Sequence, residues 1–294
     1  MGRFMTKGLS ELLKVLDVKQ LEGDNFLAPG SRNDGAEGTY GGHLLGQAVA
    51  AANLTVAYPK RVHSLHSYFL TAGEPGESYE INVVRVRDGK SFANRRVITS
   101  QRGRVVMETS VSFCVDSKGI ILSGDRPPNM KLLPEPTKIP RYPELMALQN
   151  PLPFHEDWAL REHGLDIRVI NAPWAPAGVS EKKGIRAWVK ANGIAPDDLG
   201  LHFALAAYHS DESLADNLLV PFGLTWGSNG TFMVSLDHAM WFHKAIDFNK
   251  WHLVDQWAIG AENERGVATG RLWNQSGQLC ASFTQEALIR IENY

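Results

Sequence analysis

The prolines of this chain are concentrated in one segment, and this constrains the fold more than any other feature of the sequence. Of the 15 prolines among 294 residues, ten fall between positions 118 and 180. Proline lacks a backbone N–H and disrupts helix interiors and central strands. We therefore expect 118–180 to be a long irregular connection with one short helix, separating an N-terminal unit, 1–117, from a C-terminal unit, 181–294.

The two units carry similar patterns in the same order. Small apolar residues fill two stretches of helical length, 41–59 and 199–214, and strand-like runs follow, beginning with 63–70 and 234–243. Apolar residues at alternate positions predict antiparallel strands with one buried face. The expected fold class is α+β: a long helix wrapped by a curved antiparallel sheet, built twice, with hairpins near the end of each unit and the two sheets joined edge to edge.

Before the first of these helices, the segment 9–26 has leucines at helical spacing and ends in alternating residues. It predicts a short packing helix with Ser10 as its N-cap, running into an edge strand. Nothing in it carries chemistry.

The composition is that of a globular protein without a strongly charged surface. Apolar residues make up 44% and charged residues 21% of the chain, and the formal net charge is -2. This balance gives no long-range attraction for nucleic acid. The two cysteines, Cys114 and Cys280, form neither a disulfide framework nor a CxxC metal site. Because no apolar run is long enough for a membrane span or a signal peptide, we expect a cytoplasmic protein.

Two motifs suggest chemistry that their spacing argues against. His238 and His243 in SLDHAMWFH are five positions apart, so on a strand they point to opposite faces and cannot chelate one metal ion. GGHLLGQ, from Gly41 to Gln47, lacks the Lys and Ser or Thr of a phosphate loop. Its glycines either let a helix N-terminus approach another group, with N–H donors for a thioester carbonyl or an anion, or serve only the turn. No metal or cofactor is expected.

Three polar side chains interrupt apolar patterns in the C-terminal unit. Gln285 falls in the apolar row of a strand, where an amide without partners would cost about 1–3 kcal/mol. Asp211 continues the small apolar stripe of a helix at its negative end, and both effects raise a carboxyl pKa toward that of a general base. Ser235 is expected to share its strand face with Asp237 and Trp241. Each has an ordinary structural explanation, but an acid, a hydroxyl and an amide together favour a site.

The surroundings of Ser235 argue against a covalent nucleophile. Neither a GxSxG turn nor a neighbouring base accompanies it in the sequence. These residues fit better with a mechanism in which Ser235 and Gln285 hold a water molecule and Asp211 removes its proton. Backbone N–H groups would stabilise the oxyanion. Such a weakly activated water needs a good leaving group. A thioester supplies one, because a thiol has a pKa of about 8.5.

Several ordered motifs resemble one known family. The motifs AAYHSD, SLDHAMWFH and TQEALIR in the C-terminal unit, and GGHLLGQAVAAA, HSLHSYFL and GKSFANRRVITSQRG in the N-terminal unit, are similar to segments of the type II acyl-CoA thioesterases. The resemblance covers both units and fails only in the proline-rich connection. It implies a double hotdog with an N-terminal hotdog at 1–117, the connection at 118–180 and a C-terminal hotdog at 181–294.

The resemblance also implies an activity and a set of site residues. The reaction would be hydrolysis of fatty acyl-CoA to a free fatty acid and coenzyme A, without a cofactor, by a homodimer or homotetramer. The implied catalytic residues are Asp211, Ser235 and Gln285. The residues implied to bind substrate are Gly42, His43, Arg95 and Arg265. His43 stands where many members have glutamine, so we expect it to influence chain-length preference or to titrate near pH 6.5.

Two other functions remain open. A hotdog hydratase or dehydratase acting on enoyl or hydroxyacyl thioesters would need an Asp/His pair near the acyl β-carbon, and it would not need Gln285. A catalytically silent acyl-CoA sensor would keep the fold and the ligand without needing a general base.

Overall fold

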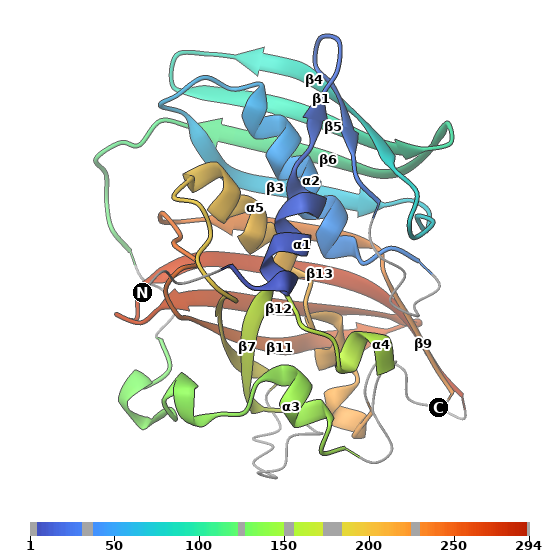
Figure 1. The fold of residues 1–294 in the computed structure, drawn as a ribbon, viewed down its shortest axis with the longest axis vertical. Coiled ribbons are helices and arrows are strands. Elements are labelled where there is room, and N and C mark those ends of the chain that lie inside the picture. Colours follow the sequence, from blue (N-terminus) through green and yellow to red (C-terminus); the bar gives the residue numbers. More distant parts are fainter. Residues whose placement is uncertain are drawn as a thin grey trace.

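The computed structural model describes residues 5–30, 38–122, 127–149, 156–172, 184–224 and 230–292. Within them, one large antiparallel sheet curves around two long helices (Figure 1). The helices are α1 (Lys7–Leu16), α2 (Gly41–Leu54), α3 (Tyr142–Met146), α4 (Glu156–Ala159) and α5 (Leu199–Ser210). The 3-10 helices are η1 (Met130–Leu132), η2 (Pro136–Lys138), η3 (Ala215–Leu218) and η4 (Val220–Phe222).

Thirteen strands in the described part of the chain form the sheet. They are β1 (Lys19–Gln20), β2 (Asn25–Ala28), β3 (Arg61–Phe69), β4 (Tyr79–Asp88), β5 (Phe92–Gln101), β6 (Arg104–Cys114), β7 (Leu165–Asn171), β8 (Arg186–Ala191), β9 (Thr231–Ser235), β10 (Asp237–Phe242), β11 (His252–Glu262), β12 (Arg265–Asn274) and β13 (Leu279–Ile291). Their order is β1-β2-β4-β5-β6-β3-β10-β13-β12-β11-β8-β7, and β9 also pairs with β13. All of these pairings are antiparallel.

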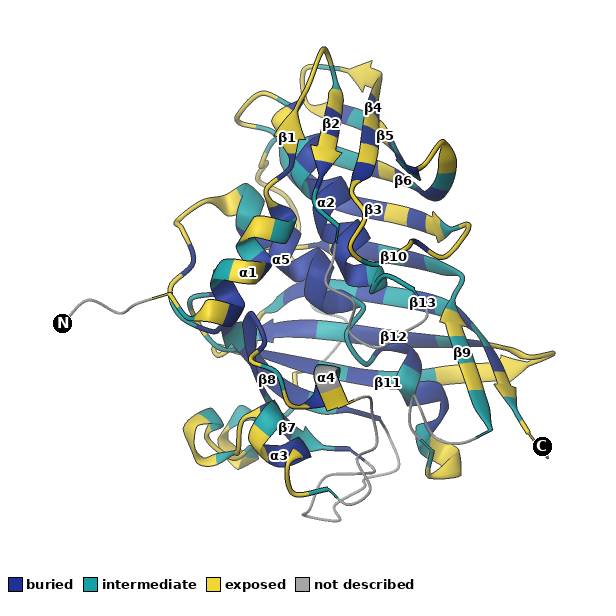
Figure 2. Ribbon diagram, turned by 45° about the vertical axis from the view of Figure 1, so that its right-hand side comes forward, coloured by how far each residue is buried: buried dark blue, intermediate teal, exposed yellow. Residues whose placement is uncertain are grey.

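The two central helices form because good helix formers fill both predicted stretches. α2 and α5 are rich in alanine and leucine, and about three quarters of their residues are buried. They pack against each other, with Gly46 of α2 close to Ala204 of α5. Figure 2 shows both as dark-blue helices inside the curve of the sheet. The predicted helices are thus confirmed, although α2 ends at Leu54 and α5 at Ser210, earlier than expected.

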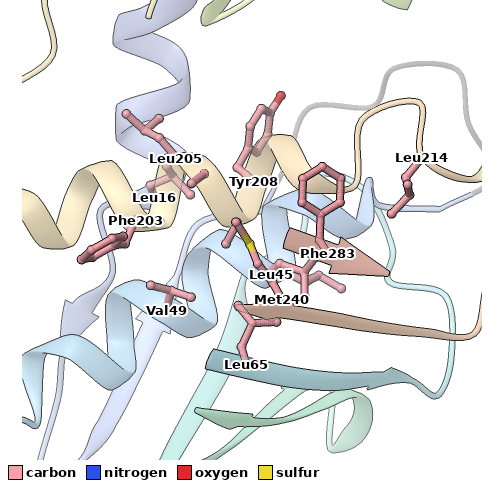
Figure 3. Close-up of a cluster of buried hydrophobic side chains, with 14 of the residues drawn as sticks. Leu16, Leu45, Val49, Leu65, Phe203, Leu205, Tyr208, Leu214, Met240 and Phe283 are labelled. Carbon is pink, nitrogen blue, oxygen red and sulfur yellow. The ribbon is translucent and has the colours of Figure 1, made fainter. Parts of the chain in front are cut away.

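The core lies between these helices and the inner face of the sheet (Figure 3). The side chains there that are at most 1% exposed include Leu45, Val49, Leu65, Phe203, Leu205, Met240 and Phe283. Complete burial of a side chain of this size stabilises the fold by about 1.5–3 kcal/mol. This layer holds the ends of α2 and α5 in fixed positions over the strands.

The pairing of β3 with β10 joins the strands that precede the proline-rich segment to those that follow it. His238 lies opposite Ser67 in this register, and both are buried. The strands before and after the proline-rich segment therefore belong to one continuous sheet. The predicted hairpins near the end of each unit also form, at Gly103 between β5 and β6 and at Gly277 between β12 and β13.

A β-bulge separates β9 from β10. Both strands pair with β13, but the register shifts by one residue at Leu236, which lies between them. The expectation that Ser235 and Asp237 share a face is wrong for this reason. Ser235 and His238 instead point to the inner face, where each contacts Gln285.

The backbone of Leu236 connects three strands at this point. Its N–H donates to the carbonyl oxygen of Glu286 in β13 at 2.9 Å, and its carbonyl oxygen accepts from the N–H of Phe69 in β3 at 3.0 Å. The carboxylate of Asp237 also accepts from the Glu286 N–H, at 2.7 Å. Both backbone polar groups of Leu236 are thus hydrogen-bonded.

The described part of 118–180 contains more regular structure than one short helix. It includes η1, η2, α3 and α4, and β7 extends the sheet by pairing with β8. β7 has no proline and carries Leu165, Ile167 and Val169 at alternate positions, so it can join a sheet. The prolines at 151, 153, 173 and 176 lie outside the described residues.

The N-terminal helix and edge strand form as expected, with a different cap. α1 is followed by β1 at the edge of the sheet. Thr6 is the N-cap, and its hydroxyl oxygen accepts a hydrogen bond from the Leu9 N–H at 3.2 Å. The prediction of Ser10 as the cap is wrong, because the helix begins at Lys7, four residues before the start that this cap implies.

Candidate active site

Gln285 is the buried amide at the centre of the candidate site. It lies on the inner face of β13 with 1% of its surface exposed, as the alternation of the strand predicts. Its Nε2 donates to Ser235 Oγ at 2.7 Å, and its Oε1 lies 2.6 Å from His238 Nδ1. The structure therefore brings Ser235 and Gln285 into direct contact.

Asp211 joins this pair from the end of α5. It is the C-cap residue of the helix, and its carboxyl accepts hydrogen bonds from the Gln285 side chain and from the Gly42 backbone N–H. Burial outweighs both hydrogen bonds and raises the pKa of Asp211 to about 6. The sequence analysis also predicts a raised pKa for Asp211. A carboxylate with such a pKa is suited to take a proton from water.

The glycines that begin α2 allow the helix to start directly against the end of α5. A Cβ on Gly42 would overlap the carbonyl oxygen of Tyr208, and a Cβ on Gly41 would lie 2.9 Å from Asp211 Oδ2. The prediction that these glycines let the start of the helix approach another group closely is confirmed. The approached group is the end of α5, and the Gly42 N–H is directed at Asp211.

His238 extends the hydrogen-bond network beyond Gln285. Its Nε2 lies 2.8 Å from Ser210 Oγ, and its ring stacks on Phe283 with 6.4 Å between centroids and 15° between planes. Burial lowers the pKa of His238 to about 4, so the ring is neutral at pH 7. The sequence did not predict the contact of His238 with Gln285, because the bulge that turns His238 toward Gln285 leaves no pattern in the residues.

A second carboxyl with a perturbed pKa follows Asp211. Burial raises the pKa of Glu212 to about 8, while the Arg161 guanidinium acts to lower it and Asp211 raises it. Its side chain also shares a hydrogen bond with the Tyr40 hydroxyl. Sequence reasoning missed Glu212, because Arg161 belongs to the proline-rich connection, whose path the sequence does not predict.

His43 is buried in α2 between two aromatic rings. Its ring centroid lies 5.4 Å from that of Tyr40 and 5.2 Å from that of Tyr208. Burial, with a smaller effect from Arg161, lowers the pKa of His43 to about 3. The expectation of a group that titrates near pH 6.5 is therefore wrong, and the influence of His43 on chain-length preference stays a prediction.

Arg95 is buried at the opposite end of α2. Its guanidinium donates to Thr55 Oγ1 at 2.8 Å, to the Thr55 carbonyl at 3.1 Å and to Asp88 Oδ1 at 2.6 Å. Thr55 caps the C-terminus of α2, whereas Asp211 contacts its first turn, and a helix of 14 residues spans about 20 Å. A substrate contact at Arg95 does not fit this placement, because the side chain instead ties the helix end to the sheet.

Arg265 lies on the outer face of the sheet. It pairs with Leu288 of β13, so it faces away from the side on which Gln285 lies. Its guanidinium lies 3.9 Å from the Glu286 carboxylate, and both side chains are solvent-accessible. A substrate contact beside Gln285 does not fit Arg265 either.

The described residues contain no group of three or more His, Cys, Asp or Glu side chains placed to hold a metal ion. Two further histidines form hydrogen bonds with serines of neighbouring strands, His243 with Ser282 at 2.8 Å and His63 with Ser112 at 2.9 Å.

None of the helices that the structure describes is long and apolar enough to cross a bilayer. Two surface cavities, one beside α3 and β7 and one beside β2 and β4, are lined by residues other than those of the candidate site.

Comparison with known proteins points to one family. Residues 28–114 match the family described as acyl-CoA thioesterase N-terminal domain, and residues 168–288 match the family described as acyl-CoA thioesterase. Human acyl-coenzyme A thioesterase 8 is 33% identical over 287 residues, covering 95% of this chain and 87% of that protein.

Solved structures agree with this assignment. The acyl-CoA thioesterase II TesB2 of Mycobacterium marinum has a TM-score of 0.76 at 30% identity, covering 96% of this chain and 98% of that one. A protein of unknown function with a hot dog fold from Alicyclobacillus acidocaldarius has a TM-score of 0.74 at 18% identity, covering 95% and 97%, and shows the fold alone. The chain therefore belongs to the type II acyl-CoA thioesterase family.

Proposed function

We propose that the protein hydrolyses fatty acyl-CoA to a free fatty acid and coenzyme A with a water activated by Asp211, Ser235 and Gln285. The observation that carries this proposal is the contact of Asp211 and Ser235 with the same buried amide, Gln285. A general base, an alcohol and an amide around one point can activate water without a covalent intermediate. The similarity to proteins named acyl-CoA thioesterases supports the substrate class.

In the proposed reaction, Asp211 accepts a proton from the water as the water oxygen attacks the thioester carbonyl carbon. Its Oδ1 is buried and has no hydrogen-bond partner among the described residues, which supports this role. Ser235 Oγ already accepts from Gln285, so its hydroxyl hydrogen is available to orient the water oxygen. Gln285 then sets the separation of the base and the alcohol.

The tetrahedral intermediate collapses by breaking the carbon–sulfur bond. Coenzyme A leaves as a thiolate, and the proton on Asp211 moves to that thiolate. The direction is favourable, because a carboxyl with a pKa of about 6 is more acidic than a thiol with a pKa of about 8.5. The Gly42 N–H is engaged by Asp211, so in this proposal other backbone N–H groups stabilise the oxyanion.

We also propose that the chain is a double hotdog, with hotdog units at 1–117 and 181–294 and a connection at 118–180. The repeated order supports this organisation: α2 precedes β3 to β6, and α5 precedes β9 to β13. The packing of α2 on α5 and the pairing of β3 with β10 are consistent with two units joined side by side.

The test is thiol release from a series of acyl-CoAs of increasing chain length, measured with dithionitrobenzoate. Asp211→Asn is expected to lower kcat by about 100-fold or more, because removal of a general base costs about 10²–10⁴-fold. Asp17→Asn, at an exposed aspartate that caps α1, is the matched control and should leave kcat unchanged.

Three outcomes would contradict the proposal. Binding of acyl-CoA without thiol release at any chain length would favour a silent sensor. Hydration of an enoyl-CoA in place of thiol release would favour a hydratase. A covalent acyl group trapped on Ser235 would replace the water mechanism by a nucleophilic serine.

A further inference from the structure

We propose that His238 is a positioning residue for this hydrolysis: its Nδ1–H holds the oxygen of the Gln285 amide and thereby directs the amide hydrogens toward Ser235 and Asp211. The inference rests on the proposed function of the site. His238 forms its hydrogen bonds with Gln285 and Ser210, so it acts through Gln285 and not on the substrate.

The hydrogen atoms of the network can be assigned from the chemistry of each group. Burial keeps His238 neutral, so its ring carries one N–H and one acceptor nitrogen. The Gln285 oxygen, 2.6 Å from Nδ1, can only accept, so the hydrogen is on Nδ1. Nε2 must then accept, and the Ser210 hydroxyl, 2.8 Å away, donates to it.

One other arrangement of hydrogens satisfies the same contacts. The Ser210 hydroxyl is also 2.9 Å from the Ala207 carbonyl oxygen and could donate there. His238 would then carry its hydrogen on Nε2, and the Gln285 amide would have to turn over to donate to Nδ1. That rotation would place the amide oxygen against the Asp211 carboxylate, which is unfavourable when Asp211 is ionised. The active, ionised form of Asp211 therefore requires the Nδ1–H tautomer.

The ring of His238 is fixed in place by its surroundings. It is 1% exposed, stacks on Phe283 and lies on β10 opposite the buried Ser67. A hydrogen bond from a ring that cannot rotate orients Gln285 better than a bond from a mobile group. The bulge at Leu236 places Ser235 and His238 on the same face, so the two ends of one amide have separate partners.

Three substitutions at His238 separate positioning from packing. Asn carries a side-chain N–H near the place of Nδ1, Gln carries one near the place of Nε2, and Leu carries neither. We expect His238→Leu and His238→Gln to lower kcat by about 100-fold with KM changed less than about threefold, as for a misplaced catalytic group. His238→Asn should recover kcat to within about tenfold of the unsubstituted protein.

A double-substitution cycle tests whether His238 acts through Gln285. In a Gln285→Ala background, His238→Leu should cause no further loss of kcat beyond about twofold, because the group that it orients is already absent. Additive losses in the cycle would overturn the proposal. Melting temperatures measured on every variant show whether a loss of kcat simply follows a loss of folding.

A direct reading of the tautomer completes the test. Nitrogen-15 correlation spectra of the intact protein at pH 7 should show the neutral Nδ1–H form of His238. The Nε2–H form, or equal kcat for His238→Asn and His238→Gln, would overturn the proposal while leaving acyl-CoA hydrolysis intact. Absence of thiol release from the unsubstituted protein would instead refute the proposed function.

Discussion

The first turn of α2 meets the last turn of α5 at Gly42 and Tyr208, where a side-chain carbon on Gly42 would overlap the Tyr208 carbonyl oxygen. This contact brings the Gly42 N–H to the carboxyl of Asp211. The catalytic geometry proposed for the second half of the chain therefore depends on a glycine in the first half.

Gly42→Ala should separate the two helices and move the N–H away from Asp211. Overpacking of a dense core costs about 1–3 kcal/mol, so we expect a lower free energy of unfolding and a loss of kcat larger than any change in KM. Gly260→Ala is the matched control, because a Cβ on Gly260 meets no atom within 4 Å. Equal behaviour of the two variants in denaturant unfolding and thiol release would contradict this account of Gly42.

The rate of hydrolysis should follow the ionisation of Asp211. Only the carboxylate can accept a proton, and burial raises its pKa to about 6, so kcat/KM should rise through pH 6 and level off above about pH 7. Gln285→Ala removes a hydrogen bond that lowers this pKa, so the midpoint of the residual activity should move upward. A midpoint near pH 4 would mean that another group limits the rate.

The raised pKa of Asp211 also implies a cost to stability. Asp211 has a pKa of 3.8 as its ordinary value and about 6 in the folded chain, so the free energy of unfolding falls as pH rises between these values and stays reduced above pH 6. Asp211→Asn carries no charge and should therefore be more stable, by about 3 kcal/mol at pH 8 and about half as much at pH 5. Urea unfolding at both pH values measures this, with Asp17→Asn as the control.

His209 should make the fold sensitive to acid. Both ring nitrogens are buried without hydrogen-bond partners among the described residues, and burial lowers the pKa of His209 to about 3. An unfolded histidine takes up a proton below about pH 6.5, so this contribution to stability is complete above pH 6.5 and is lost as the pH falls toward 3. His209→Leu should be more stable than the unsubstituted protein, and its advantage should grow by about 2 kcal/mol from pH 7 to pH 5.

The control for this prediction is His66→Gln, at an exposed histidine on the outer face of the sheet. It should leave the free energy of unfolding at pH 7 nearly unchanged, because the side chain is exposed. If His209→Leu loses stability in parallel with the unsubstituted protein between pH 7 and pH 5, His209 does not titrate as its burial implies.

Arg95→Met should affect folding and not substrate affinity. It breaks the bonds to Thr55 and to the half-exposed Asp88, and the buried acceptors of Thr55 are left without their donor, which costs about 1–3 kcal/mol. The neighbouring Arg96, which is exposed and paired with Glu108, provides the matched control Arg96→Met, with little expected change in the melting temperature. A large rise in the KM for acyl-CoA at unchanged stability would restore Arg95 as a substrate contact.

Features that depend on local spacing could be predicted from the sequence. The helices α2 and α5, the burial of Gln285 in an alternating strand and the upward direction of the Asp211 pKa all follow from residues within a few positions of one another. In each case the periodicity of a single helix or strand is sufficient for the prediction.

Features that depend on distant parts of the chain could not be predicted. The bulge at Leu236 reverses the alternation of its strand without a glycine or proline to mark it, so the orientation of His238 toward Gln285 was missed. The bond of Arg95 to Thr55 was not predicted for a similar reason, since the two residues lie 40 positions apart. The contacts of His238 and Arg95 can be inferred only when the register of the paired strands is known.

The peptide groups on either side of Leu236 have a mechanical consequence. One hydrogen bond from this residue reaches β13, which carries Gln285, and another reaches β3, which belongs to the first half of the chain. Ser235 precedes this junction, and His238 follows it two positions later. The same residue therefore helps to hold the two halves of the chain together and to align Ser235 and His238 with Gln285. A force that pulls β3 away from β10 would also disturb the contacts of Gln285.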